Sequence, residues 1–453
     1  MTTEQIERIR IGQNFRGILN DLKRRPEDAA KELGITVEDV NAIIEGKKEL
    51  SHDIVIRAAK VWPINARDFY LIHDDCHLGV KIMRAEDSKK SNRIMDRAGK
   101  PYYEYRDTAM SSLAPFRPEW IMELCIVGDN DPNNIDIQWN NGHFMHQFTY
   151  FVGDVNFYYK GPNEEKKVAI MNTGDSMYIT PFVPHSFATR KGSGKKGLIL
   201  ALTYGNKLAG ETKQELSALS AELASEFALN FVTSERASAS LLTFHREAGS
   251  LSVEELARRT SIPAETILDF ENAKKIPSFS EYSILANALM VNVRDLIPND
   301  ATEEKVIAQH HNRGSRWFFP ESTKIYEFVE LTSTKNLPYS KAMELTILGS
   351  NNFDDLDLRM GLHQYGYNVG ETSVKMNWFI NGKHFHEKID PGDSFYVKPF
   401  VRHNFREKGK LLILRVGGKV VGEPQRELSV IGKENVQRAV TETMQWYDVR
   451  GKS

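Results

Sequence analysis

The chain repeats itself, and this repeat constrains the fold more than any other feature of the sequence. From about Ser240 onward, the sequence matches the N-terminal helical region without gaps at an offset of 227, so that Ala30 aligns with Ala257. Further segments repeat downstream, where GDSMYITPFVPHSF at 174 matches GDSFYVKPFVRHNF at 392. Self-similarity of this length predicts two tandem copies of one two-domain unit.

The first part of each copy has the pattern of an all-α domain. From about Ile11 to Ile72, apolar residues recur at spacings of three and four, with a turn signal at Gly34. A helix ending near Leu33, followed by Thr36 as the cap of VEDVNAII, predicts a helix-turn-helix. The second helix carries two acids near its start and no arginine, so its composition argues against DNA binding in the major groove.

The second part of each copy changes to the pattern of strands. Between about Gly79 and Tyr204, runs such as HQFTYFVGDVNFYYKG alternate with Gly, Asn and Asp, which predicts an antiparallel barrel or jelly roll. We interpret SNRIMDRAGKPYYEYRDTA as a loop entering this barrel, and the segment from Glu211 to Phe231 as helical. The predicted fold class is α+β, a tandem repeat of helix-turn-helix-like domain and β-barrel, with domains at 1–78, 79–232, 233–300 and 301–453.

Composition narrows the class of protein. Hydrophobic residues make up 41% of the chain, charged residues 26%, and the net charge of −2 argues against a general nucleic-acid binder or a membrane-surface protein. Cys76 and Cys125 cannot form a disulfide framework and lack metal-type spacing, which predicts a reducing cytoplasm. The sequence contains no run of 18 apolar residues and no signal-peptide pattern, so we expect a cytoplasmic protein without a membrane span.

Two motifs in the first barrel carry candidate metal ligands. In GDSMYITPFVPHSF, a glycine turn and two prolines lead into His185, a pattern that resembles the cupin signature. In NNGHFMHQFTYFVGD, side chains two and four apart share one face if the segment is a strand. His143 and Gln147 would then face the barrel interior, and His146 would face away. This parity gives the candidate metal set His143, Gln147 and His185.

The metal interpretation has a structural alternative, because a histidine on a strand is often a satisfied core residue. Two histidines and a glutamine converging in one barrel favour a metal. Imidazole with an oxygen donor suits non-heme Fe(II), while the ligand types alone also allow zinc or manganese. A neutral amide leaves such a site one charge more positive than a carboxylate would, which favours an anionic ligand such as a phosphonate or a phosphate.

The second barrel provides an internal comparison. It retains Gln364 and His403, but Met360 stands at the position of His143, so one donor is missing. We therefore predict that the first barrel is active and the second is a degenerate scaffold. The second barrel also keeps a histidine at the position of His146, which is compatible with a structural role for that residue.

Polar residues near the motifs could hold an anion. Arg97 can contact an oxyanion with two N–H groups, Tyr105 adds a hydroxyl donor, and Asn140 precedes the first candidate ligand. By themselves, these three are better explained as surface or turn residues.

Taken together, these features resemble the hydroxyethylphosphonate dioxygenase and methylphosphonate synthase family, and the likeness spans essentially the whole chain. It rests on the tandem architecture, the NNGH segment with His143 and the PHS segment with His185. The dioxygenase pattern has a glutamate ligand six residues before the second histidine, a position held here by Ile179. The synthase pattern has instead a glutamine four residues after the first histidine, and Gln147 matches it.

The resemblance implies a non-heme iron oxygenase of phosphonate biosynthesis. Its implied reaction is the Fe(II)- and O2-dependent conversion of 2-hydroxyethylphosphonate to methylphosphonate and bicarbonate or CO2 by C–C bond cleavage. The alternative within the family gives hydroxymethylphosphonate and formate. An alternative from another class is a cupin regulator that senses a ligand and binds DNA.

The resemblance also implies a substrate-binding set. It consists of Lys23, Arg97, Tyr105 and Asn140, of which Tyr105 and Lys23 would also be catalytic. Lys23 would give the helical domain a role without DNA, acting in its own chain or in a neighbouring chain of a homo-oligomer.

Overall fold

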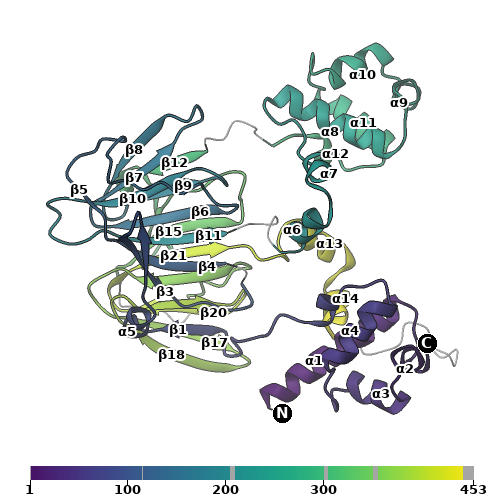
Figure 1. Cartoon of the computed structure of the whole chain (residues 1–453), viewed down its shortest axis with the longest axis horizontal. Coiled ribbons are helices and arrows are strands. Elements are labelled where there is room, and N and C mark those ends of the chain that lie inside the picture. Colours follow the sequence, from purple (N-terminus) through teal and green to yellow (C-terminus); the bar gives the residue numbers. More distant parts are fainter. Residues whose placement is uncertain (1, 115, 205–209, 300–304, 350–355, 442–453) are drawn as a thin grey trace. The chain divides into compact units, whose positions relative to one another are not determined.

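The computed structural model describes residues 2–114, 116–204, 210–299, 305–349 and 356–441 (Figure 1). The chain divides into two compact units. The first comprises Met1–Lys81, Ser111–Ala114 and Gly418–Ser453, and the second comprises Ile82–Met110 and Pro115–Gly417. Helical domains and β-sheets are separate along the chain, so the α+β fold class is confirmed.

The N-terminal domain is a helical bundle containing the predicted helix-turn-helix. Its elements are α1 (Thr3–Asp21), α2 (Pro26–Leu33), α3 (Val37–Ile44), α4 (His52–Val61) and the 3-10 helix η1 (Ala66–Phe69). Helix α2 ends at Gly34, which adopts a left-handed φ of 64°. The Thr36 hydroxyl then accepts a 3.1 Å hydrogen bond from the Asp39 amide and caps α3. Both boundaries are as predicted.

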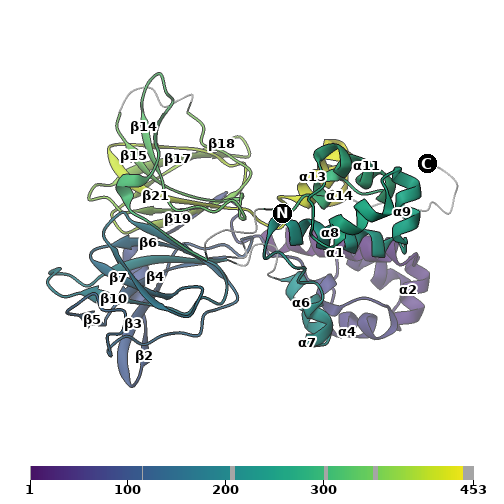
Figure 2. The same ribbon diagram turned by 90° about the horizontal axis from the view of Figure 1, so that it is seen from above.

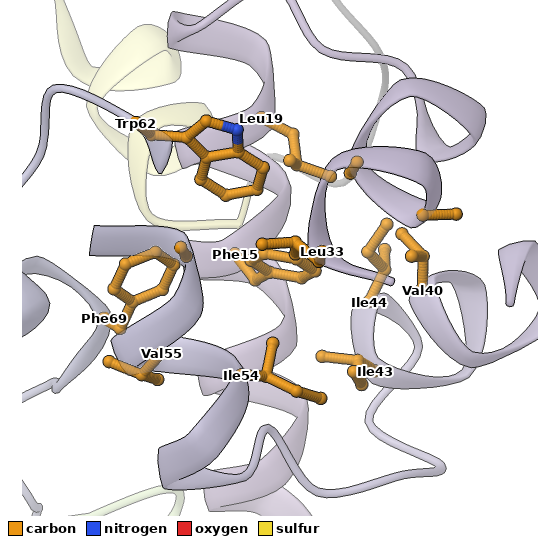
Figure 3. Close-up of a cluster of buried hydrophobic side chains, with 13 residues drawn as sticks. Phe15, Leu19, Leu33, Val40, Ile43, Ile44, Ile54, Val55, Trp62 and Phe69 are labelled. Atoms are coloured by element: carbon orange, nitrogen blue, oxygen red, sulfur yellow. The ribbon is translucent and has the colours of Figure 1, made fainter. Parts of the chain in front are cut away.

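Buried side chains from every helix hold this domain together (Figure 3). Phe15 lies near the middle of the cluster, fully buried, and its ring centroid is 6.2 Å from that of Phe69. Trp62 is also buried, and its indole N–H donates a 2.5 Å hydrogen bond to Glu32. Each large apolar side chain of this kind contributes about 1.5–3 kcal/mol by burial.

The second copy of the helical domain has the same element order. It contains α8 (Ser234–Ala248), α9 (Val253–Thr260), α10 (Ala264–Glu271), α11 (Phe279–Leu289) and α12 (Val293–Leu296). Its core includes Leu242, Leu256 and Phe270. The helical segment predicted before it forms two short helices, α6 (Glu211–Ala218) and α7 (Ala221–Ser225), because Ser220 caps the second through the Leu223 amide. The remaining helices are α5 (Ala85–Lys90), α13 (Glu423–Ile431) and α14 (Lys433–Thr441).

The first β-domain consists of two sheets that share one core. The strand order is β12-β9-β6-β11-β4-β3-β2 in one sheet and β5-β10-β7-β8 in the other. Ile121 and Phe151 from the first sheet pack in one cluster with Phe157 and Phe187 from the second. The strands are β2 (Arg93–Arg97), β3 (Lys100–Asp107), β4 (Arg117–Glu123), β5 (Ile126–Val127), β6 (His146–Val152), β7 (Val155–Lys160), β8 (Lys166–Met171), β9 (Ser176–Ile179), β10 (His185–Arg190) and β11 (Leu198–Tyr204).

The loop predicted at the entrance of this domain is wrong, because the segment forms the β2–β3 hairpin. Ala98 and Gly99 make its two-residue turn with φ of 49° and 74°, a conformation that matches the twist of paired strands. Three tyrosines follow in β3, of which Tyr102 and Tyr103 are deeply buried, and aromatic residues of this kind are enriched in strands. The basic residues around the turn concealed this pattern in the sequence.

The second β-domain also consists of two sheets, and its strands β13 to β21 are coloured from green to yellow in Figure 1, as Figure 2 shows from above. The orders are β1-β19-β16-β21-β15-β14-β13 and β18-β17-β20. The two β-domains exchange strands, because β12 precedes the second domain in the chain but pairs with β9 of the first. The strands are β1 (Val80–Met83), β12 (Val306–Gln309), β13 (Arg316–Phe319), β14 (Tyr326–Glu330), β15 (Ser340–Ile347), β16 (His363–Asn368), β17 (Val374–Ile380), β18 (Lys383–Ile389), β19 (Ser394–Val397), β20 (Arg402–Arg406) and β21 (Gly409–Val416), with the 3-10 helix η3 (His311–Arg313) between β12 and β13.

The four predicted domains stay predictions. The boundaries after residues 78 and 232 fall between elements of secondary structure, and the boundary after residue 300 lies outside the described residues. The compact units group the chain differently. Among the helices in the described ranges, none has both the length and the apolar character required to cross a membrane.

Candidate active site

A cavity of about 190 Å³ in the first β-domain brings together six of the seven predicted site residues. The predicted members are Arg97, Tyr105, Asn140, His143, Gln147 and His185. The other lining residues are Tyr103, Glu119, Ile121, Phe187, Ala201 and Thr203.

His143 reaches this cavity from an irregular segment, because β6 begins only at His146. The strand parity proposed from the sequence is therefore wrong for His143. Gly142 turns the chain with a φ of 72°, and a side chain there would meet the backbone of Phe182 at 2.5 Å. The Phe182 amide donates a 2.9 Å hydrogen bond to the His143 carbonyl and fixes the segment. His143 Nε2 consequently lies 3.0 Å from Gln147 Oε1.

The orientation of the Gln147 amide is set by Thr149. Gln147 is buried on β6, and its Nε2 donates a 2.8 Å hydrogen bond to the Thr149 hydroxyl. The amide oxygen therefore points at His143. His143 Nδ1 donates a 2.9 Å bond to the Met145 carbonyl, which can only accept, so Nε2 of the neutral imidazole carries a lone pair. In this tautomer, His143 Nε2 and Gln147 Oε1 are two acceptors that face each other at hydrogen-bond distance.

His185 is held in the matching tautomer. Its Nδ1 donates a 2.8 Å hydrogen bond to the Val183 carbonyl, and burial lowers the pKa of the imidazole to about 4. Asn140 Oδ1 accepts from the His185 and Gly142 amides at 2.8 and 3.0 Å, so its Nδ2 is the atom that lies 3.1 Å from His185 Nε2. His185 is therefore a neutral ring with its Nε2 lone pair in the cavity.

These three donors fit a metal ion by their chemistry. His143, Gln147 and His185 each use their second polar atom on a fixed protein partner, so Nε2, Oε1 and Nε2 are the atoms that could bind a cation. Of these three atoms, His185 Nε2 also lies 3.1 Å from Asn140 Nδ2. The rings of the two histidines are perpendicular, with centroids 5.2 Å apart. In the described ranges, no group of three or more His, Cys, Asp and Glu residues is arranged to hold a metal.

Arg97 and Tyr105 form the polar wall of the cavity. The Arg97 guanidinium lies 4.7 Å from the ring centroid of Tyr103 and donates a 2.7 Å bond to the Gln138 carbonyl. Among the described residues, no carboxylate forms an ion pair with Arg97. Burial raises the pKa of Tyr105 to about 12, so its hydroxyl remains a donor at neutral pH.

The second β-domain separates structural residues from site residues. The Tyr103 hydroxyl accepts a 3.0 Å hydrogen bond from the Phe187 amide, and the Tyr326 hydroxyl accepts one of the same length from the Phe405 amide. His146 likewise contacts the Tyr178 hydroxyl at 2.7 Å, as His363 contacts that of Tyr396 at 2.6 Å. Both contacts occur in both copies, so neither contact depends on the complete donor set. Tyr105 has no such counterpart, because Phe328 occupies its position in the strand register.

The missing histidine of the second domain is accompanied by an added arginine. Thr203 pairs with Gln147 in the first domain, and Arg415 pairs with Gln364 in the second. Arg415 Nε donates a 3.0 Å bond to Gln364 Oε1, whose amide Nε2 lies 3.0 Å from His403 Nε2. A guanidinium thus binds the amide oxygen that would otherwise face a metal.

Sequence reasoning missed Thr149, Thr203, Glu119 and Glu123. Thr149 lies two residues after Gln147 and could have been found by strand spacing. Glu119 lines the cavity, pairs with Arg93 at 2.9 Å and has a pKa raised by burial. In the sequence, Glu119 and Glu123 are ordinary acids in a strand.

Lys23, the seventh predicted residue, belongs to the first compact unit. It follows α1 with a positive φ of 57°, and its Nζ donates a 2.9 Å bond to the Asp21 carbonyl. Its predicted role at the substrate stays a prediction.

The fold and this donor set define a class, the cupin-like metal-dependent enzymes with a two-histidine site. Comparison with known proteins refines the class. The chain is 58% identical to methylphosphonate synthase of Nitrosopumilus maritimus (strain SCM1) over 445 residues, 98% of this chain and 97% of that protein. The chain therefore belongs to the methylphosphonate synthase family.

Solved structures and a family model agree with this placement. HEPD of Streptomyces albus, with 2-hydroxyethylphosphonate and Fe(II) bound, superposes with a TM-score of 0.91 at 35% identity, covering 97% of this chain and 99% of that one. PhpD with cadmium shares the fold, with a TM-score of 0.73, 19% identity and coverage of 95% and 99%. A helix-turn-helix family model matches residues 245–296, which contain α9 to α12.

Proposed function

We propose that this protein is a non-heme iron oxygenase that converts 2-hydroxyethylphosphonate and O2 to methylphosphonate and bicarbonate or CO2. The observation that carries the proposal is the amide donor Gln147, which faces His143 at 3.0 Å and has Ile179 directly opposite on the neighbouring strand. The high identity to methylphosphonate synthase and the Fe(II) and 2-hydroxyethylphosphonate bound in HEPD support both cofactor and substrate.

The proposed ligands of Fe(II) are His143, Gln147 and His185. When bound, the iron supplies the redox chemistry by which O2 reacts with the substrate. The chain contributes the fixed donors. Hydrogen bonds to the Met145 carbonyl, the Thr149 hydroxyl and the Val183 carbonyl prevent rotation of the three side chains. A preorganised set of this kind needs little rearrangement to receive the metal.

The charge of the cavity supports a dianionic substrate. Two neutral imidazoles and a neutral amide leave the charge of a divalent metal unbalanced by its ligands. Arg97 adds a positive charge with no carboxylate partner among the described residues, whereas the nearby Glu119 is paired with Arg93. We propose that Arg97 and Tyr105 bind the phosphonate oxygens and that Asn140 donates from Nδ2 to the substrate. Lys23 is proposed as a further phosphonate contact, from the same chain or a neighbouring one.

The reaction balances without another reductant. The 2-hydroxyethylphosphonate dianion and O2 contain the same atoms and charge as methylphosphonate dianion, bicarbonate and one proton. The C–C bond breaks, the carbon bearing phosphorus gains hydrogen, and the carbinol carbon is oxidised. Phosphorus NMR of an incubation with Fe(II), O2 and 2-hydroxyethylphosphonate tests the proposal. Methylphosphonate is the expected product, and its absence would contradict the function.

The dioxygenase outcome is the alternative within the family. It has the same atom balance, but gives hydroxymethylphosphonate and formate. The 35% identical structural relative is an HEPD, which makes this outcome a serious competitor. Hydroxymethylphosphonate as the main phosphorus product would establish it.

A ligand-sensing DNA-binding regulator is the alternative from another class, favoured by the helix-turn-helix match at 245–296. The second helix of the motif in that copy, α10, carries Glu265, Asp269 and Glu271 and no basic residue. The negative charge of this helix would repel the phosphate backbone of DNA. Sequence-specific DNA binding with a steep salt dependence, together with absence of iron turnover, would favour the regulator.

We further propose O2 as the co-substrate, a homo-oligomeric assembly and a cytoplasmic location. Neither the buried Cys76 nor the partly buried Cys125 forms a disulfide, as suits a reducing compartment. Sedimentation analysis tests the assembly.

A further inference from the structure

A buried carboxyl group lies beneath the cavity and has no role in the proposed site. Strand β4 directs alternate side chains inward, so Glu119 and Ile121 line the cavity and Glu123 follows on the same face. Glu123 is fully buried, with 0% of its surface exposed. Its backbone is fixed, because its amide donates a 2.9 Å bond to Gly197 and its carbonyl accepts a 2.7 Å bond from Thr189.

The carboxyl group itself is unsatisfied. Neither oxygen of Glu123 has a hydrogen-bond partner in the described part of the protein. An isolated carboxylate in an apolar interior is strongly destabilising, so the group holds a proton instead. Burial accordingly raises the pKa of Glu123 well above its ordinary value, and only the positive charge of Arg97 opposes this rise.

Packing does not require an acid here. Glu123 lies opposite Tyr103, and its amide bonds to Gly197. The equivalent residue of the second β-domain is Ile347, which lies opposite Tyr326 and pairs with Gly409. Ile347 is 1% exposed, so the same fold accommodates an apolar side chain at this position. The carboxyl group occurs in the domain with the complete donor set and is absent from the other.

Arg97 connects Glu123 to the cavity. Tyr103 pairs with Glu123 across the strands, and the Arg97 guanidinium stacks on the Tyr103 ring at 4.7 Å. The titratable groups that face Glu123 are Arg97, the Tyr103 and Tyr105 hydroxyls and the Cys125 thiol. Arg97 is the one cation among them.

We propose that Glu123 is a positioning residue that competes with the bound phosphonate for the charge of Arg97 and so limits phosphonate binding at alkaline pH. The proposal rests on the proposed function, because it takes a phosphonate as the ligand of Arg97. While Glu123 is protonated, the guanidinium charge is available to the ligand. Once Glu123 ionises, its negative charge pairs with Arg97 and repels the dianion. By linkage, phosphonate binding also favours protonation of Glu123.

The test compares E123Q with the wild type, because glutamine keeps the volume of the acid without its charge. Anaerobic calorimetry of the iron-loaded proteins with methylphosphonate measures affinity without turnover. We expect the ratio of the affinity of E123Q to that of the wild type to rise at least ~10-fold as the pH is raised from neutral into the alkaline range, one pKa unit being one tenfold step. Titration of the ligand itself is common to both proteins and cancels from the ratio.

Two controls make the result decisive. Glu104, on β3, pairs with Arg106 at 2.7 Å, and E104Q should leave the affinity ratio level across pH. E123L, which imitates Ile347, replaces E123Q if that variant does not fold. A level ratio for folded E123Q or E123L overturns the proposal, as does absence of methylphosphonate binding by the wild type. Binding with the expected ratio but without turnover of 2-hydroxyethylphosphonate would instead contradict the proposed function alone.

Discussion

Gln147 and Ile179 lie directly opposite each other on the antiparallel strands β6 and β9. Both side chains are buried, with 4% and 0% of their surfaces exposed. In the sequence they are 32 residues apart and unrelated by any spacing rule. Their pairing explains how the family can have two ligand patterns. A donor side chain at either position would be attached to neighbouring backbone sites of one sheet.

The first prediction concerns the amide donor. Gln147→Ala should lower iron content and turnover together, because two imidazoles alone hold the metal weakly. Thr149→Val leaves Gln147 in place but frees its amide, and should weaken iron affinity ~10–100-fold, as loss of a supporting hydrogen bond typically does. Iron analysis after gel filtration measures both effects. His146→Ala is the matched control, since its ring contacts Tyr178. Retention of iron and turnover by Gln147→Ala would refute the ligand set.

The second prediction uses the pairing across the sheet. In a Gln147→Ala background, Ile179→Glu should restore iron binding, because its carboxylate would enter the cavity from the neighbouring strand. Phosphorus NMR should then show a larger share of hydroxymethylphosphonate, as the dioxygenase pattern implies. A folded double variant that stays free of iron would show that the two positions are not exchangeable.

The third prediction separates two neighbouring tyrosines. Tyr105→Phe reproduces Phe328 of the second domain, so it should keep the thermal midpoint and raise KM for 2-hydroxyethylphosphonate ~10-fold through loss of a charge-assisted hydrogen bond. Tyr103→Phe removes the hydroxyl that bonds to the Phe187 amide, and should cost about 1–3 kcal/mol of stability. Steady-state kinetics and calorimetric melting measure the two effects. Equal kinetic effects of both substitutions would contradict the assignment.

The sequence contained most of the site, although not always for the reason first inferred. The convergence of His143 and Gln147 follows from the left-handed turn at Gly142, because His143 precedes the strand on which parity was assumed. The repeat favoured a structural role for His146, and its contact with Tyr178 recurs in the second domain.

Other features depend on register across strands and could not be predicted. Arg415 looks like one of many basic residues until β21 is placed beside β16, where it reaches Gln364. Glu123 looks like a surface acid at the end of a strand until its burial is known. The hairpin around Gly99 was missed because basic residues obscured the tyrosines of β3 as a strand signal. Contacts between distant segments decide the first two of these features.

The fourth prediction is a loss of stability of the iron-free protein in acid. Burial lowers the pKa of His185, His363 and His403 to about 4, from an ordinary value of 6.5. Between these values the unfolded chain binds more protons than the folded one, so stability is fully present above about pH 6.5 and is lost as pH falls towards 4. Each histidine should contribute on the order of 1–3 kcal/mol to this loss. Urea midpoints across this range measure it, and His363→Gln should show a shallower dependence. A level midpoint would contradict the prediction.

The fifth prediction tests why the second domain should hold no metal. Met360 replaces the first histidine, but the Arg415 guanidinium also binds Gln364 Oε1 at 3.0 Å, so restoring the histidine alone leaves a fixed cation beside the donors. Met360→His should therefore keep the iron content at about one per chain, whereas Met360→His with Arg415→Thr, which copies Thr203, should raise it to about two. Iron analysis and Mössbauer spectra of the purified variants distinguish the outcomes. Equal iron content in the single and double variants would show that Arg415 does not keep the second site closed.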